Sequence, residues 1–197
     1  MTMFFIDTET TGIGQNAEAW EIAILCTDDN GKWLTSIVQN CKPQTAWEPK
    51  ALEMSGLQDY ELNGFKQPKK ALEIIFKFIK QNADPDKWNN KIVIHNAEYD
   101  IRVLNYMCEK YGIAERLTDF VGYDNVICTM QALRMLKQAG RWNKSSALKH
   151  AHDLLNIPEY DRHRAMQDVE TTCWLFFEIQ RNLRKNGFID KLKRLFK

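Results

Sequence analysis

Residues 4–12 read Phe-Phe-Ile-Asp-Thr-Glu-Thr-Thr-Gly, an apolar run that ends in two acids, Asp7 and Glu9. The run has the composition of a buried β-strand, and side chains two residues apart on a strand project from the same face. Burying two neighbouring carboxylates is costly unless a positive charge lies between them. The pair therefore predicts a metal ion at this edge of a sheet.

The composition is that of an ordinary globular protein. The chain has 197 residues, of which 44% are hydrophobic and 27% are charged, a balance that suits one domain. No apolar run is long enough to span a membrane, and the segment before Asp7 is too short for a signal peptide, so we expect a cytoplasmic protein with no membrane partner. The five cysteines include no Cys-x-x-Cys pair, which argues against a disulfide framework and a zinc knuckle.

The net charge of +1 is unevenly distributed. From Arg181 onward there are seven basic residues and one acidic residue, a surplus of six positive charges, so the preceding part carries a net charge of −5. This asymmetry suits a polyanion-binding segment beside an acidic centre, although a charge run alone is more often a solvated, lysine-rich helix end. We therefore divide the chain into a domain of residues 1–185 and a basic amphipathic C-terminal segment, residues 186–197, of the same domain.

Hydrophobic periodicity predicts strands first, and then strands that alternate with helices. Asn30-Gly31 predicts a tight hairpin between the second and third strands, and Asn96 and Ser145 or Ser146 are placed to cap helices. An antiparallel meander followed by this alternation predicts an α/β domain with a mixed five-stranded sheet. The predicted strands cover residues 3–8, 18–27, 32–40, 91–95 and 126–129, and the predicted helices start at Pro68, Ala97, about Met130, the Ser145-Ser146 pair and Ala165.

Two later segments carry further acids at matching positions. Asp100 ends His-Asn-Ala-Glu-Tyr-Asp and Asp168 ends His-Arg-Ala-Met-Gln-Asp, so each acid follows a histidine by five residues. Asp100 falls in the first turns of a helix that follows a strand, and sites in such sheets form where strands end. We expect these acids to lie close to Asp7 and Glu9.

A set of carboxylates without cysteine favours Mg²⁺ or Mn²⁺ over zinc. Two such ions, roughly 3.5–4 Å apart, can bind the attacking and leaving oxygens of a phosphodiester. An imidazole titrates near neutral pH and is suited to accept a proton from water. We select His163 as this base because it follows the proline-containing stretch 156–161, which predicts a mobile loop, whereas His95 ends a buried strand and is expected to be structural.

In order and spacing, the three segments resemble the motifs of the DnaQ-like DEDDh exonucleases: Asp-x-Glu-Thr-Thr-Gly, His-Asn-Ala-x-aromatic-Asp and His-Arg-Ala-x-x-Asp. The resemblance extends from Met3 to about Phe177. It implies a ribonuclease-H-like fold and removal of nucleotides from a free 3′ end with two divalent ions, Mg²⁺ or Mn²⁺. The residues that it implicates are Asp7, Glu9, Asp100 and Asp168 as metal ligands and His163 as the general base.

The resemblance also implies substrate contacts after the first motif, where Gly12 lets the backbone approach a sugar and Ile13 offers an apolar face to a base. The family's next substrate element often reads His-Gly-Ile, whereas this chain has Ser55-Gly56-Leu57. Tyr99 stands where phenylalanine is commoner, a change that we expect to leave the packing intact. The candidate substrate contacts are Thr10, Gly12, Ile13, Ser55 and Asn96.

Single-stranded DNA is the substrate that we expect, but the motifs do not distinguish it from RNA, so an RNA-trimming exoribonuclease or an oligoribonuclease is the alternative. A catalytically silent nucleic-acid-binding adaptor would not need the complete set of acids, and a nucleotide phosphatase would have no use for the basic segment. Leu192, Leu195 and Phe196 faintly resemble a peptide that docks on a replication clamp, and packing of Leu195 and Phe196 on the domain explains the same residues.

Overall fold

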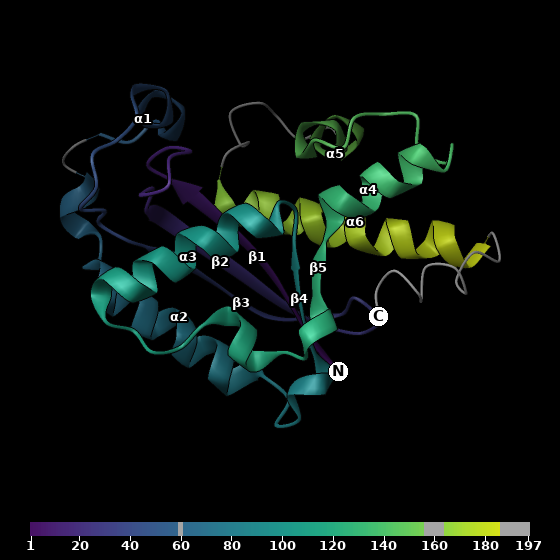
Figure 1. The fold of residues 1–197 in the computed structure, drawn as a ribbon, viewed down its shortest axis with the longest axis horizontal. Coiled ribbons are helices and arrows are strands. Elements are labelled where there is room, and N and C mark those ends of the chain that lie inside the picture. Colours follow the sequence, from purple (N-terminus) through teal and green to yellow (C-terminus); the bar gives the residue numbers. More distant parts are fainter. Residues whose placement is uncertain (59–60, 156–163, 186–197) are drawn as a thin grey trace.

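The computed structural model describes residues 1–58, 61–155 and 164–185. Within these ranges five strands form one sheet in the order β3-β2-β1-β4-β5 (Figure 1). β1 pairs with β2, and β2 with β3, in antiparallel fashion, whereas the β1–β4 and β4–β5 pairs are parallel. The mixed five-stranded sheet predicted from the sequence is therefore confirmed. The strands are β1 Thr2–Thr10, β2 Ala19–Asp28, β3 Trp33–Asn40, β4 Asn90–Ile94 and β5 Val126–Cys128.

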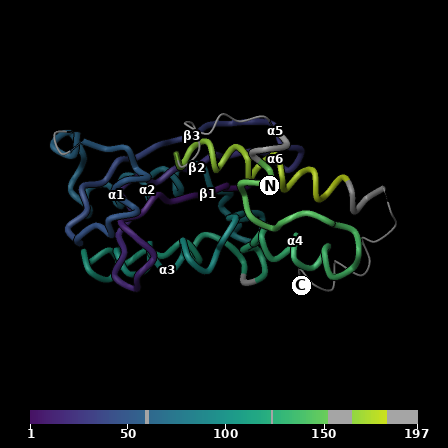
Figure 2. The backbone as a smooth tube through the Cα atoms, turned by 90° about the horizontal axis from the view of Figure 1, so that it is seen from above, coloured from purple at the N-terminus to yellow at the C-terminus, as the bar shows by residue number. Residues whose placement is uncertain are grey.

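Helices cover both faces of the sheet. In β1, Phe4 and Ile6 pack into a core with α2 and α3, whereas Met3 and Phe5 pack against α6. Figure 2 shows α3 and α6 on opposite sides of β1. A strand that is buried on both faces reads as a continuous apolar run, which is the pattern seen before Asp7. The helices are α1 Pro49–Ser55, α2 Pro68–Asn82, α3 Ala97–Tyr111, α4 Thr129–Gln138, α5 Leu148–Leu155 and α6 Ala165–Lys185.

Three local features differ from the sequence-based expectation. β1 continues to Thr10, so Glu9 lies within the strand. α1 was not predicted, because its seven residues bury no side chain and so show no apolar period. Asn96 occupies the cap position of α3, but its side chain makes no capping bond. Its carbonyl closes the first turn instead, accepting from the backbone N–H groups of Tyr99 and Asp100 at 2.9 and 3.4 Å.

The predicted hairpin at Asn30-Gly31 joins β2 to β3. Gly31 N donates to the carbonyl of Asp28 at 3.2 Å, and Asp28 N donates to the carbonyl of Lys32 at 3.0 Å. The Asp28 carboxylate also accepts from Asn30 N and Lys32 N, both at 2.9 Å. Gly31 has a φ of +85°, a left-handed conformation that glycine adopts without steric cost.

None of the helices in the described ranges is both long and apolar enough to cross a bilayer. The C-terminal segment 186–197, with Leu192, Leu195 and Phe196 proposed for a clamp contact, lies outside the described residues.

Replacing Gly31 with alanine should destabilise the protein more than the same change at Gly140. Both glycines are left-handed, at φ +85° and +69°, so each substitution should cost about 1 kcal/mol in backbone strain. A Cβ at Gly31 would also lie 3.0 Å from the Phe177 ring, whereas nothing lies within 4 Å of one at Gly140. We expect an additional loss of about 1 kcal/mol for Gly31→Ala in urea denaturation. Equal losses would show that packing on Phe177 contributes nothing.

Candidate active site

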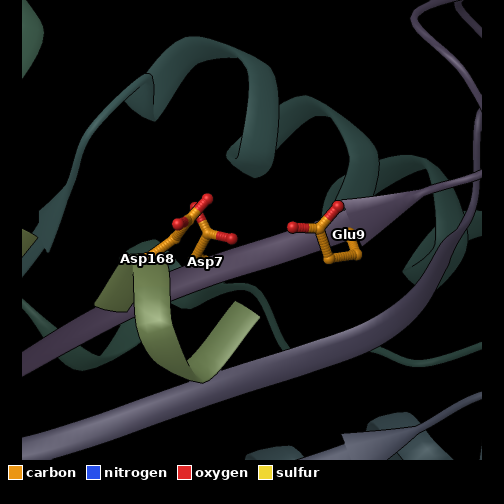
Figure 3. A group of neighbouring side chains, drawn as sticks. All are labelled: Asp7, Glu9 and Asp168. Atoms are coloured by element: carbon orange, nitrogen blue, oxygen red, sulfur yellow. The ribbon is translucent and has the colours of Figure 1, made fainter. Parts of the chain in front are cut away.

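Three carboxylates converge where β1 meets the start of α6. Asp7 and Glu9 share the β1 face that packs on α6, because Met3 and Phe5 on the same alternation contact that helix. Asp168 lies in the first turn of α6. One carboxylate oxygen from each of the three residues lies within 4.8 Å of the other two. Figure 3 shows Asp7 and Glu9 projecting from the strand and Asp168 approaching Asp7 from the helix.

Asp100 reaches the site from the other face of the sheet. It lies in the first turn of α3 and is buried. Its Oδ1 accepts from the backbone N–H of Thr8 at 3.0 Å and from the Thr8 hydroxyl at 2.7 Å. Thr8 lies between the two acids of β1 and, by alternation, points towards α3. Its two hydrogen bonds orient the Asp100 carboxylate.

The site resists the accumulation of negative charge. Burial, followed by the charges of Asp100 and Asp168, raises the pKa of Asp7 well above its usual value. Burial and the charge of Asp168 raise the pKa of Glu9 to about 8. Burial also raises the pKa of Asp100 to about 7, although the hydrogen bonds from Thr8 oppose the shift. A cation between these groups would favour their ionised forms.

The donor atoms suit a hard divalent ion. The converging groups are carboxylates with no thiol among them, and oxygen ligands of this kind favour Mg²⁺ or Mn²⁺. Asp7, Glu9 and Asp168 would hold the ion directly, and Asp100 faces the same group of charges. The residues present therefore fit the metal chemistry that the sequence predicts.

An ion pair between the exposed side chain of Arg164 and the buried carboxylate of Glu21 fixes the start of α6. Glu21 on β2 lies opposite Glu9 in the β1–β2 register and is 1% exposed. Its carboxylate accepts from the Arg164 guanidinium at 2.7 Å and from the backbone N–H of Ala165 at 2.8 Å. Asp168 N in turn donates to the carbonyl of Arg164 at 3.1 Å. Glu21 thus anchors the turn that carries Asp168, a role that the sequence-based analysis missed.

Of the two histidines considered as bases, only His95 lies in the part of the chain that the structure describes. His163 lies outside the described residues, so its role remains a prediction. His95 is buried, and its Nδ1 lies 2.9 Å from the Thr129 hydroxyl. Its carbonyl accepts from Met130 N at 3.1 Å, which connects the end of β4 to the start of α4. These contacts agree with the structural role expected of His95.

The candidate substrate contacts fall into two groups. Thr10 and Gly12 lie together beside the acids: the Thr10 hydroxyl donates to the Gly12 carbonyl at 2.9 Å and lies 2.6 Å from the Tyr99 hydroxyl. Ile13 follows them, and its side chain is exposed. By contrast, the hydroxyl of Ser55, at the end of α1, donates to the carbonyl of Leu52 within its own helix, and exposed Asn96 precedes α3.

The fold is shared with solved nuclease structures. Escherichia coli exonuclease I in complex with a dT13 oligonucleotide aligns with a TM-score of 0.78 and 19% identity, over 99% of this chain and 43% of that chain. The zinc-bound complex of the same enzyme with single-stranded DNA aligns with a TM-score of 0.77 and 18% identity, over 98% and 43%. Cell-death related nuclease 4 aligns with a TM-score of 0.71 and 16% identity, over 94% and 64%. The chain thus spans less than half of exonuclease I, and the likeness concerns the fold.

Comparison of the sequence with protein-family models identifies the family. No curated protein sequence matches the chain significantly. The model of the RNase T family, described as exonuclease, matches residues 4–176, a range that includes all four acids of the site. The match covers most of the chain and coincides with the sheet, α3 and the first half of α6. The chain therefore belongs to the RNase T exonuclease family, which has the DnaQ-like, ribonuclease-H-like fold.

Proposed function

We propose that this protein is a metal-dependent 3′-to-5′ exonuclease that acts on single-stranded DNA. The observation that carries the proposal is the convergence of Asp7, Glu9 and Asp168 within 4.8 Å, beside a fourth acid on α3. Membership of an exonuclease family supports the reaction class. The likeness of the fold to exonuclease I bound to single-stranded DNA supports the choice of substrate.

Asp7, Glu9, Asp100 and Asp168 would hold two Mg²⁺ or Mn²⁺ ions. When bound, such ions activate water and neutralise charge on the scissile phosphodiester. The residues around the acids keep the ligands in place, since Thr8 orients Asp100 and Glu21 anchors the start of α6. Such supporting contacts commonly change metal affinity or activity 10- to 100-fold, roughly, when they are removed.

His163 is the proposed general base. It directly precedes Arg164, whose guanidinium is held by Glu21 beside the acidic cluster. A neutral imidazole accepts a proton from water near neutral pH, so a histidine at this point of the chain suits hydrolysis.

Asp7→Asn should abolish digestion of a 5′-labelled single-stranded DNA oligonucleotide in Mg²⁺. The wild-type protein should produce a ladder of products shortened from the 3′ end, and the variant should be slower by more than about 100-fold, because even residues that orient metal ligands have effects approaching that size. Exposed Glu73 on α2 provides the matched control, Glu73→Gln, with an unchanged rate. An Asp7→Asn variant as fast as the wild type would contradict the metal assignment.

The wild-type protein also tests the alternatives. Faster digestion of matched RNA would support the exoribonuclease alternative, and no digestion would support a silent binding domain.

Without divalent metal, the free energy of unfolding should fall as pH rises. Ordinary carboxylates ionise near pH 4, roughly, in the unfolded chain, whereas the folded protein retains protons on Asp100 up to about pH 7 and on Glu9 up to about pH 8. The unfolded state therefore gains stability relative to the folded state between these limits. In EDTA, the thermal midpoint should decrease from pH 5 to pH 8, and Mg²⁺ at about 100 times its Kd should restore about 2.7 kcal/mol at the upper end.

In the same melting experiment, Asp7→Asn should stabilise the metal-free protein at pH 8, because a neutral amide avoids the desolvation and the repulsion that raise the pKa of Asp7. It should also weaken the response to Mg²⁺. A Mg²⁺-induced shift of full size in this variant would place the ion elsewhere.

His163→Ala should lower kcat by about 10²–10⁴-fold and leave KM for the oligonucleotide nearly unchanged, since a general base acts in the chemical step. His150→Ala on α5 is the control for loss of a histidine outside the motifs. A defect confined to KM would assign the proton transfer to another group.

A further inference from the structure

Ile13 combines an exposed side chain with a main chain that is held on both sides. Its side chain is 82% exposed, more than any other large hydrophobic residue in the part of the chain that the structure describes. Nevertheless, its backbone N–H donates to Glu48 Oε1 at 3.0 Å, and its carbonyl accepts from the Arg102 guanidinium at 3.3 Å. An apolar side chain is thus presented to solvent from a tightly bonded loop.

Side-chain hydrogen bonds also hold the two flanking glycines. Gly14 N donates to Glu48 Oε1 at 3.0 Å, and Arg102 Nη1 donates to the Gly14 carbonyl at 2.9 Å. On the other side, the Tyr99 hydroxyl donates to the Gly12 carbonyl at 2.5 Å. Three side chains therefore bond three consecutive residues. We call Glu48, Tyr99 and Arg102 the loop clasp.

The clasp comes from two segments that are distant in sequence. Tyr99 and Arg102 are three residues apart on α3 and so share a face, with the guanidinium 5.0 Å from the centre of the tyrosine ring. Glu48 precedes α1, and its backbone N–H donates to the carbonyl of Thr11 at 2.7 Å. A Cβ on Gly12 would lie 2.2 Å from Glu48 Cδ, so glycine is required for the carboxylate to reach the loop.

Two residues of the clasp lie on the same turn of α3 as Asp100, the proposed metal ligand. Asp100 lies between Tyr99 and Arg102 in sequence and is bonded to Thr8 of β1. The Tyr99 hydroxyl also contacts Thr10, the last residue of β1. Tyr99 and Arg102 thus connect the loop that carries Ile13 to the helix and the strand that carry the acids. Tyr99 is therefore more than a packing substitute for phenylalanine, because its hydroxyl joins the second motif to the loop after the first.

We propose that Glu48, Tyr99 and Arg102 are positioning residues that hold Ile13 ready to pack on the base of the substrate's 3′-terminal nucleotide. The inference rests on the proposed nuclease function. Every nucleobase presents an apolar face, and a surface that is already ordered binds it without the entropic cost of ordering a loop. The clasp thus acts on substrate affinity through Ile13 and leaves the chemical step alone.

A double-mutant cycle tests the clasp. Ile13→Ala, Tyr99→Phe and Arg102→Gln should each raise KM for a single-stranded DNA oligonucleotide, by about tenfold for Ile13→Ala and severalfold for the other two, while kcat stays within about twofold. In the Ile13→Ala background, Tyr99→Phe and Arg102→Gln should have no further effect. Additive effects, or losses in kcat, would overturn the proposal, because they would show that the clasp acts elsewhere or only supports the fold.

Substrate and protein controls sharpen this result. An oligonucleotide with an abasic 3′-terminal residue should bind wild type and clasp variants equally, and a persisting difference would exclude contact with the terminal base. Tyr106→Phe, two turns further along α3, and Lys77→Gln, on the exposed face of α2, should behave as wild type. Thermal midpoints of the clasp variants should stay within a few degrees of wild type.

Binding of the same oligonucleotides in EDTA, followed by fluorescence anisotropy, separates the two proposals. If the wild type binds but does not digest DNA, the proposed function fails, and the same cycle in Kd still tests the clasp. If the wild type digests DNA and the cycle shows no coupling to Ile13, the clasp proposal alone fails.

Discussion

Repulsion among closely spaced, half-buried carboxylates is the constraint on which the rest of this structure depends. Asp7, Glu9 and Asp168 meet within 4.8 Å, and burial together with mutual charge raises the pKa of both β1 acids. Such a cluster would disperse if its supports were weak. Each acid is accordingly carried by regular secondary structure: Asp7 and Glu9 by the central strand, Asp100 by α3 and Asp168 by α6.

The contacts that hold α3 and α6 in place lie on opposite faces of the sheet. On one face, Thr8 bonds the Asp100 carboxylate, and on the other, β2 contributes Glu21, which bonds the start of α6. The apolar cores on the two sides of β1 supply the packing that keeps both helices in place. A strand that is buried on both faces can therefore present acids at its end to two separate helices.

Much of this arrangement was predictable because it depends on local geometry. The period of two along a strand is sufficient to place Asp7 beside Glu9, and the motif spacing identified Asp100 and Asp168. Glu21 and Thr8 escaped prediction because their roles depend on cross-strand register and on which face α3 covers, and neither is encoded in a short window. Glu48 and Arg102 escaped for the same reason: they meet at residues 12–14 only in the folded chain. The capping role of Asn96 was misassigned because a backbone carbonyl closes the turn without its side chain.

The β1–β2 pairing places Glu9 opposite Glu21. A slip of one residue would turn every side chain of the slipped strand to the other face: on β1 it would remove Phe5 from its core, and on β2 it would remove Glu21 from α6. Correct strand alignment and assembly of the acidic cluster are thus acquired together. Binding of a divalent ion would consequently report on folding itself. A chain with misaligned strands would not respond to Mg²⁺, whereas the native chain would.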